Sequence, residues 1–597
     1  MTVMKNGKGA TGAGLVLAAA LFATAAWAEG PATAIMGATV FDATGAAPHV
    51  ANVVIEDGRI VAVGPKVKAP KGAKVIKAKG LALLPGFYDV HTHWTPAGDP
   101  GLTPEIATAY VKAGVTTVDD FHEQPESFAP RRRWIASLAS PHVNFTARMS
   151  TPGGHGADWA DENTTRWVNT PQSARTEVDG LLKYKPDLIK AFTDGWRYGL
   201  SADNTSMGED TLAALVDEAH KNGLKVLTHT VTVKRGKEAA EAKVDVIAHS
   251  LQDEEIDQET VDLMVANHTA YAPTLAVYEP GKGGKPLDPN DPRTAQSLKK
   301  FDNALHNVKV LHDAGVLVAL GTDAGMTGTP HGVSTLHEME LLVKAGLTPT
   351  DALMVGTANS AKAVGQLADR GTIEPGKRAD IVLIKGQPWV NISDVRNTED
   401  VFIDGKLVYG PGVSLPAANS ERSMPAIKVE APMIDDFESD RSNRDTLRLD
   451  DMDGGIDRTV QVSQTIARAD GDGHALSLDA RMAEKKGLHA GVIIPLSRGS
   501  VEPVDASTYK GVRFEIRGDG GDYAFDVNTL NGSWTKTLTA GPQWSTVEVP
   551  FTALAPEAGR GGAKGPWSGK DLLQVEFGGA RAPGSTLWLE VDNVSFY

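Results

Sequence analysis

The chain has 597 residues, too many for one ordinary hydrophobic core, so we expect at least two domains. Its formal net charge of -16 argues against nucleic acid or an anionic membrane as the main partner, because like charges repel. The absence of cysteine excludes disulfides, thiolate ligands and a cysteine nucleophile, so any metal site must use His, Asp, Glu or a modified Lys.

Residues 1–28 have the pattern of a secretory signal peptide. Lys5 and Lys8 precede the apolar run GLVLAAALFATAA, and the small residues of AWA precede a cleavage position after Ala28. The apolar run is too short to cross a bilayer comfortably, because about 20 residues are needed. We therefore predict a periplasmic or secreted protein with no membrane span.

Residues 29–415 are predicted to form one domain of the α/β class. Both ends of this domain have the sequence pattern of β-strands. Residues 29–86 contain short β runs, and the EDGR turn between β-branched runs is typical of a hairpin. Similar runs return at 366–415, and we expect both segments to form one composite β-sandwich. Between them, at 87–365, eight short β runs alternate with helical stretches such as EDTLAALVDEAHKNG. This alternation predicts a (β/α)8 TIM barrel.

The rest of the chain changes character. Residues 416–432 are rich in Pro, Ser and Ala and are predicted to be a linker. From 433 to 597, apolar and polar residues alternate between Gly, Asp and Asn turns. This pattern predicts a C-terminal all-β, jelly-roll-like sandwich.

Histidines and one aspartate stand where several predicted barrel strands end. In a strand, His91 and His93 of FYDVHTH would point to the same face. A lone HxH is a weak signal, since two polar residues can simply end a strand. His229, His249 and Asp323 also end predicted strands, however, and barrel active sites are assembled at that face. Together these side chains suit zinc or another borderline divalent ion.

Lys190 stands at the same end of the fourth predicted strand, in PDLIKAF. Its ammonium would repel a cation, and an ion-paired or solvated lysine is the plain alternative. A lysine that has reacted with carbon dioxide is instead an anionic carbamate, which can bridge two metals. That reaction needs a neutral amine, which burial near cations favours.

These strand-end residues, taken in chain order, resemble the ligands of the metal-dependent amidohydrolase superfamily. The resemblance is to its prolidase-like and imidazolonepropionase-like branch. The resemblance spans residues 34–410 and includes LPGFYDVHTH, GTDAG, TANSAKAVG and GTIEPGKRADIVLI. It implies two divalent metal ions, expected to be zinc. The implied ligands are His91, His93 and Asp323 for the more buried ion, His229 and His249 for the second, and N6-carboxylated Lys190 as the bridge. It also implies attack on an amide by a metal-activated hydroxide, with Asp323 as the catalytic general acid and base.

Four further residues are candidates for substrate contact. His155 lies in a GGHG loop that resembles the loop of prolidase-like members, and Tyr271, Tyr278 and His331 follow the seventh and eighth strands. The alternatives are a loop histidine without a role and a buried tyrosine with a satisfied hydroxyl. Val231 stands where members of this branch often carry a second His, which leaves the local substrate contacts open.

Residues 433–597 resemble galactose-binding-like sandwiches, including the type in complex I intermediate-associated proteins. The matching text is IDDFES, WSTVEVPF and LWLEVDNVSF. Because such domains often bind sugars through exposed aromatics, Trp534, Trp544 and Trp567 are candidates, with buried core Trp as the alternative. Some relatives hold a structural calcium between the first and last strands, which would here involve Glu438 and Asp592.

The leading hypothesis is an exported metal-dependent hydrolase that cuts the C–N bond of dipeptides or N-acyl amino acids. The alternatives are a cyclic amide, lactone or phosphotriester hydrolase, because fold and ligands do not fix the substrate, or an inactive barrel that serves as a carbohydrate-binding or surface protein. The expected partners are a small amide or peptide substrate, and a carbohydrate at the C-terminal domain. The sequence leaves the oligomeric state open.

Overall fold

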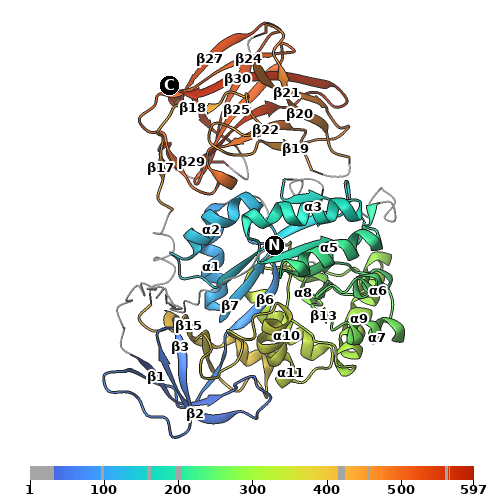
Figure 1. Cartoon of the computed structure of the whole chain (residues 1–597), viewed down its shortest axis with the longest axis vertical. Coiled ribbons are helices and arrows are strands. Elements are labelled where there is room, and N and C mark those ends of the chain that lie inside the picture. Colours follow the sequence, from blue (N-terminus) through green and yellow to red (C-terminus); the bar gives the residue numbers. More distant parts are fainter. Residues whose placement is uncertain are drawn as a thin grey trace, which may run out of the picture.

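A computed structural model describes residues 32–95, 100–157, 163–195, 205–284, 286–413, 424–454, 457–471, 473–558, 562–563 and 565–597. The predicted signal peptide and the first part of the predicted linker lie outside these ranges. Within them, no helix has the length and hydropathy that crossing a membrane requires. Figure 1 shows the chain passing from a small sheet through a barrel into a sandwich that lies against the barrel.

The small sheet combines both ends of the first half of the chain. Its strands before the barrel are β1 (Thr33–Val40), β2 (His49–Glu56), β3 (Arg59–Gly64), β4 (Lys74–Lys77) and β5 (Leu81–Pro85). Those after the barrel are β14 (Ile381–Lys385), β15 (Thr398–Ile403) and β16 (Lys406–Tyr409). The order is β16-β15-β14-β5-β1-β2-β3, with β4 beside β1, so β5 and β14 join the two segments. The EDGR turn links β2 to β3, with Asp57 and Gly58 at φ of 47° and 77°.

The barrel wall is a curled parallel sheet. In order around the wall its strands are β6 (Phe87–Thr92), β7 (Val115–Asp120), β8 (His142–Ser150), β10 (Leu188–Phe192), β11 (Lys225–His229), β12 (Val246–Ala248) and β13 (Ala270–Tyr271). A short β9 (Thr165–Trp167) pairs with β8. The α/β barrel prediction is therefore confirmed in its order of parallel strands.

The last two predicted strands are less regular than expected. The seventh stops at Tyr271, because Pro273 has no N–H and Thr274 has a φ of 48°; a short α8 (Leu275–Tyr278) follows. The eighth, at 316–323, is an extended segment with isolated bridges. The Tyr271 amide donates to the Leu317 carbonyl at 2.9 Å, and the Val90 amide to the Leu320 carbonyl at 2.8 Å. This segment therefore closes the wall between β13 and β6.

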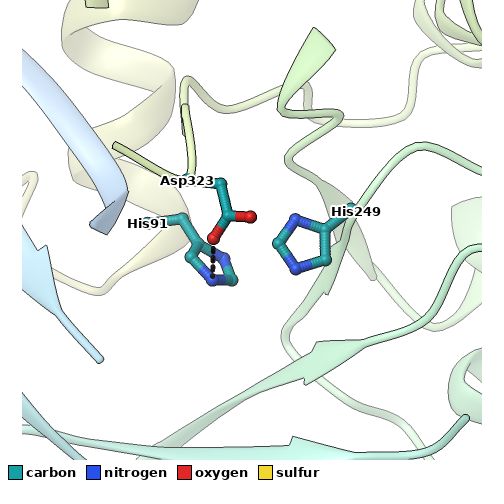
Figure 2. Close-up of side chains that lie close together, drawn as sticks. All are labelled: His91, His249 and Asp323. Carbon is teal, nitrogen blue, oxygen red and sulfur yellow. Dashed lines mark ion pairs between the residues drawn. The ribbon is translucent and has the colours of Figure 1, made fainter. Parts of the chain in front are cut away.

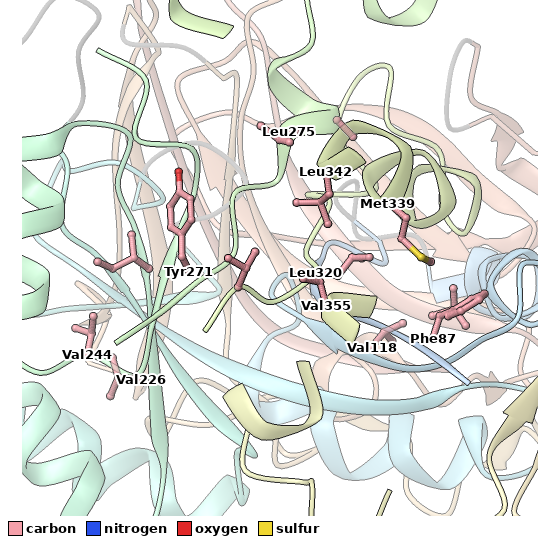
Figure 3. Packing of buried hydrophobic residues seen from close by; sticks show 14 of the residues in the cluster. Phe87, Val118, Val226, Val244, Tyr271, Leu275, Leu320, Met339, Leu342 and Val355 are labelled. Carbon is pink, nitrogen blue, oxygen red and sulfur yellow. The ribbon is translucent and has the colours of Figure 1, made fainter. Parts of the chain in front are cut away.

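Helices surround the wall and bury its outer face. They are α1 (Thr103–Lys112), α2 (Phe128–Ile135), α3 (Pro171–Leu181), α5 (Glu209–Lys221), α6 (Val233–Glu241), α7 (Gln258–Ala266), α9 (Pro292–Asp313), α10 (Val333–Lys344), α11 (Pro349–Met354) and α12 (Ser360–Ala363). Figure 3 shows part of this packing, in which Leu320 lies among Met339, Leu342 and Val355, all four buried in one cluster. The apolar stripes of these helices thus hold the strand ends in fixed positions.

The C-terminal domain is all-β, as predicted. One sheet contains β17 (Ile427–Lys428), β19 (Leu449–Met452), β22 (Ala490–Pro495), β23 (Val504–Asp505), β25 (Asp522–Thr529), β26 (Gly532–Thr539), β28 (Ala555–Pro556) and β29 (Leu572–Gly579). The other contains β18 (Met433–Asp435), β20 (Val460–Ala467), β21 (His474–Arg481), β24 (Gly511–Gly518), β27 (Ser545–Pro550) and β30 (Thr586–Phe596). Phe514, Phe525 and Phe577 meet in the core between them.

The three candidate sugar-binding tryptophans pack within this domain. The rings of Trp534 and Trp567 lie 5.4 Å apart, and Trp567 also packs on Phe551 at 4.9 Å. The Arg468 guanidinium lies 4.2 Å from the ring of Trp544. Their stacking faces are thus used by neighbouring side chains, which favours the structural alternative.

The candidate calcium ligands contact different partners. Glu438 accepts a hydrogen bond from the His474 amide at 2.6 Å, whereas Asp592 pairs with Arg468. In the described part of the chain, no cluster of three or more metal-ligating side chains includes Glu438 or Asp592. An arginine in contact with Asp592 supplies the positive charge that a calcium ion would otherwise bring.

The sandwich is attached to the barrel by polar and apolar contacts. Arg441 pairs with Glu126 at 2.8 Å, and the side-chain amide of Asn163 donates to the Asp450 carbonyl at 2.8 Å. Trp134, Leu138, Met424 and Val501 form a buried cluster at the junction. Met424 belongs to the predicted linker, and β17 also pairs with β23 there. Part of that segment is therefore regular structure, because Met424 is buried at the junction and β17 extends a sheet of the sandwich.

Candidate metal centre

The side chains predicted at the strand ends converge at the carboxyl end of the barrel wall. One ligating atom each from His91, His249 and Asp323 lies within 4.8 Å of the others (Figure 2). The nearer oxygen of Asp323, Oδ1, is 3.4 Å from His91 Nε2 and 2.9 Å from His93 Nε2. The HxH pair and the aspartate, 230 positions apart, therefore meet at one point.

The remaining predicted ligands complete the cluster. The rings of His229 and His249 lie 4.7 Å apart, and the ring of His249 is 4.4 Å from that of His91. Lys190 Nζ lies 3.3 Å from His91 Nε2 and donates to the Thr228 carbonyl at 3.2 Å. The structure thus brings all six predicted ligand side chains together.

Two glycines of the GTDAG motif make room for this convergence. A side chain on Gly321 would place its Cβ 3.0 Å from the Cβ of His91. A Cβ on Gly325, whose φ is +103°, would come within 2.1 Å of the His93 carbonyl oxygen. Between them Asp323 has a φ of 58° and donates its amide to the His91 carbonyl at 2.8 Å. The motif therefore fixes the carboxylate against the first strand.

Burial controls the protonation of these groups. It lowers the pKa of His91 well below its usual value, that of His249 to about 3, and that of Lys190 well below its usual range. Burial acts to raise the pKa of Asp323, but nearby His249 and His93 outweigh it and keep that pKa well below normal. Neutral imidazoles beside an ionised carboxylate are a donor set that fits a divalent ion of the zinc type.

Asp89 helps to position the metal centre through hydrogen bonds, and the sequence analysis did not include it among the candidates. Its Oδ2 accepts hydrogen bonds from the hydroxyls of Thr322 and Thr335, both at 2.7 Å. Burial raises the pKa of this carboxyl to about 7. Asp89 ties β6 to the segment carrying Asp323, and a carboxyl group among the apolar residues Phe87, Tyr88 and Val90 is the signal that could have identified it.

Two other supporting residues also escaped prediction. The hydroxyl of Thr274 lies 2.8 Å from His249 Nδ1, and His122 Nδ1 lies 3.2 Å from His93 Nδ1. Such contacts orient the ring of a ligating histidine and select its tautomer. No sequence motif identifies Thr274 or His122, because each one meets its histidine partner only when the chain is folded.

The candidate substrate contacts have different positions. The ring of His155 stacks on that of His229 at 4.0 Å, and Tyr278 lies 5.9 Å from His249, so both adjoin the centre. His331 Nε2 lies 2.9 Å from the His93 carbonyl oxygen and supports the backbone there. Tyr271 is fully buried, and its hydroxyl accepts the Leu251 amide at 2.9 Å. The structure thus favours the structural alternative for Tyr271.

A parallel barrel with histidines, a lysine and an aspartate at its strand ends defines a metal-dependent hydrolase. The chain belongs to the amidohydrolase family, whose family model matches residues 82–408. It is therefore a hydrolase that acts on C–N bonds. Residues 439–581 match the model of complex I intermediate-associated protein 30.

Relatives and solved structures agree with this assignment. An imidazolonepropionase of Deinococcus radiodurans is 27% identical, with 58% of this chain and 87% of the relative aligned. An ochratoxinase of Aspergillus niger is 24% identical, with 64% and 88% aligned. The structure is similar to a Xaa-Pro dipeptidase (TM-score 0.56, 25% identity, 64% and 100% covered) and to a putative prolidase from Bifidobacterium longum (TM-score 0.57, 26% identity, 66% and 99% covered).

Thr274→Val tests the contact that orients His249. Removing the hydroxyl should weaken metal affinity by about 10- to 100-fold, because the ring loses its partner. Chelator competition with the zinc-loaded chain measures this, and Thr546→Val, an exposed change on β27, should leave affinity unchanged. Equal affinities in the two variants would show that Thr274 does not position the ligand.

Proposed function

We propose that the chain hydrolyses the amide bond of dipeptides or N-acyl amino acids. The observation that carries this proposal is the convergence of His91, His93, Lys190, His229, His249 and Asp323 at one end of the barrel. Likeness to a Xaa-Pro dipeptidase supports a peptide-like substrate. Likeness to a putative prolidase supports it as well. Both names describe enzymes that cut the peptide bond of a dipeptide.

We propose that two zinc ions bind here: His91, His93 and Asp323 would hold one ion, and His229 and His249 would hold the other. Bound zinc would lower the pKa of a water molecule and would polarise the substrate carbonyl. Asp323 accepts a proton from the attacking water, whose oxygen bonds to the carbonyl carbon. As the C–N bond breaks, Asp323 delivers that proton to the departing nitrogen. We propose that His155 and Tyr278, whose rings lie beside those of His229 and His249, contact the substrate.

We propose that Lys190 is carboxylated at Nζ, which would give it an anionic oxygen ligand for both ions. Its side chain is only 1% exposed, and this burial lowers the pKa of its amine well below the usual range. A charged ammonium in these surroundings would be costly, so the neutral amine is favoured. The neutral amine can add to carbon dioxide, forming a C–N bond and releasing one proton, which leaves an anionic oxygen ligand near His91.

Asp323→Asn should abolish nearly all turnover while the fold is kept, because the amide can neither take nor return the proton. Turnover should be measured on a panel of dipeptides, N-acyl amino acids, lactones and phosphotriesters. Asp313→Asn, an exposed change at the end of α9, is the matched control and should retain activity. Full activity in metal-loaded Asp323→Asn would contradict the role of Asp323, and turnover restricted to lactones or phosphotriesters would contradict the proposed substrate class.

Carboxylation of Lys190 predicts that reactivation needs bicarbonate. Metal-free protein kept in buffer stripped of carbon dioxide should regain full activity only when zinc and bicarbonate are added together. Lys190→Gln should respond to neither addition. Full recovery of the wild type with zinc alone would exclude a carbamate ligand.

Export is proposed from Lys5, Lys8, the apolar run and the AWA sequence before Glu29. Expression in a Gram-negative host should give a periplasmic protein whose first residue is Glu29. N-terminal sequencing of the fractionated protein provides the measurement. A cytoplasmic product that begins at Met1 would contradict export.

A further inference from the structure

A cavity of about 630 Å³ lies on the carboxyl-end face of the barrel, between helix α9 and the chain that follows β13. A volume of this size is typical of a site that binds a small molecule. The wall includes side chains from α8, from α9 and from the segment after Asp323, among them Val277, Tyr278, Lys282, Arg293, Lys300 and Thr327. The cavity is therefore large enough to hold part of a substrate.

Two parts of the wall connect the cavity to the metal centre. Tyr278 lines the cavity, and its ring lies 5.9 Å from the ring of His249. Thr327 lines it as well, in a loop that folds back on Asp323 because the Thr329 hydroxyl donates to the Asp323 carbonyl at 3.1 Å. A molecule with its reacting bond at the metal centre can thus extend past Tyr278 into the cavity.

Lys282 lies where these two parts of the wall meet. Its aliphatic stem packs on the loop after Asp323, since a Cβ on Gly328 would lie 3.2 Å from the Lys282 Cγ. Its ammonium donates a hydrogen bond to the carbonyl of Val277, the residue before Tyr278. Burial lowers the pKa of Lys282, whereas the negative charge of Asp323 acts to raise it. The amine is therefore close enough to the metal centre to interact with its carboxylate.

The cavity wall carries positive charge that no carboxylate neutralises. In the described part of the chain, Lys282, Arg293 and Lys300 form no ion pair. Glu279, the one carboxylate among the described lining residues, is engaged with His337 at 2.7 Å and with Lys344 at 3.7 Å.

Lys282 also has hydrogen-bonding capacity to spare. An ammonium has three N–H donors, and the Val277 carbonyl accepts from one of them. The others remain for an acceptor that enters the cavity. A carboxylate suits this position, because charge-assisted hydrogen bonds from an ammonium are stronger than neutral ones.

We propose that this cavity binds a carboxylate of the substrate, that Lys282 pairs with it, and that Arg293 and Lys300 supply further positive charge around it. The carboxylate belongs either to the main chain of the substrate or to an acidic side chain, since both have the same chemistry. This inference rests on the proposed amide hydrolysis, because it assigns a further part of that substrate.

Matched substrates locate the carboxylate on the full-length, zinc-loaded chain. Ala-Glu is compared with Ala-Gln, and Glu-Ala with Gln-Ala, which removes a side-chain carboxylate. Ala-Ala is compared with its C-terminal amide, which removes the main-chain one. In at least one comparison the carboxylate should raise kcat/KM roughly 10- to 100-fold, as expected for hydrogen bonds between charged groups.

Lys282→Gln should bring that ratio close to one, mainly through KM and with unchanged zinc content. Lys282→Arg should keep most of it, because the positive charge remains. Lys299→Gln, an exposed change on α9 outside the cavity, is the matched control and should leave the ratio unchanged. Ratios near one in all three comparisons with the wild type, or a preference that survives Lys282→Gln, would overturn the inference.

A second variant keeps the inference testable if Lys282→Gln does not fold. Arg293→Gln combined with Lys300→Gln changes two side chains of α9 that are not buried, so the fold should be kept. This double variant should lower the carboxylate preference. An unchanged preference would contradict the part assigned to the positive charge of the cavity.

Calorimetry with glutarate, a dicarboxylate without an amide bond, separates this inference from the proposed reaction. The zinc-loaded wild type should bind glutarate about 10-fold more tightly than zinc-loaded Lys282→Gln. That difference, with no turnover on any amide, would remove the proposed function but support the carboxylate site. Turnover without a carboxylate preference, and with equal glutarate affinity in the two proteins, would leave the proposed function standing and overturn the cavity assignment.

Discussion

Placing four imidazoles, an amine and a carboxylate side by side in a water-poor site is the constraint on which this structure depends. If these groups were all charged, mutual repulsion and lost hydration would open the site. Burial keeps His249 and Lys190 neutral, and the same surroundings keep Asp323 ionised. The cluster therefore offers uncharged nitrogen lone pairs and one carboxylate. A bound cation would stabilise this arrangement.

The rest of the fold holds that cluster in place. Parallel strands put every strand end on one edge, and the hydrogen bonds of Asp89 tie the first strand to the segment that closes the barrel. The small sheet joins both flanks of the barrel through β5 and β14. Arg441 and the apolar junction hold the sandwich against the barrel.

Much of this could be predicted from the sequence, because the period of alternating strands and helices fixes which residues stand at strand ends. His91 and Asp323 were identifiable in this way. Asp89 and Thr274 were not, since their importance depends on partners that only folding supplies. The seventh strand ends early because Pro273 lacks an N–H group. The eighth strand is held in place by single hydrogen bonds to its neighbours, which the sequence pattern does not reveal.

Anomalous diffraction at the zinc edge from crystals of the zinc-loaded, full-length chain tests the central claim most directly. The account predicts two peaks enclosed by His91, His93, His229, His249 and Asp323, with density for a carboxylated Lys190 between them. A single peak beside an unmodified lysine would contradict the paired centre. The absence of any peak among these side chains would contradict the metal site itself.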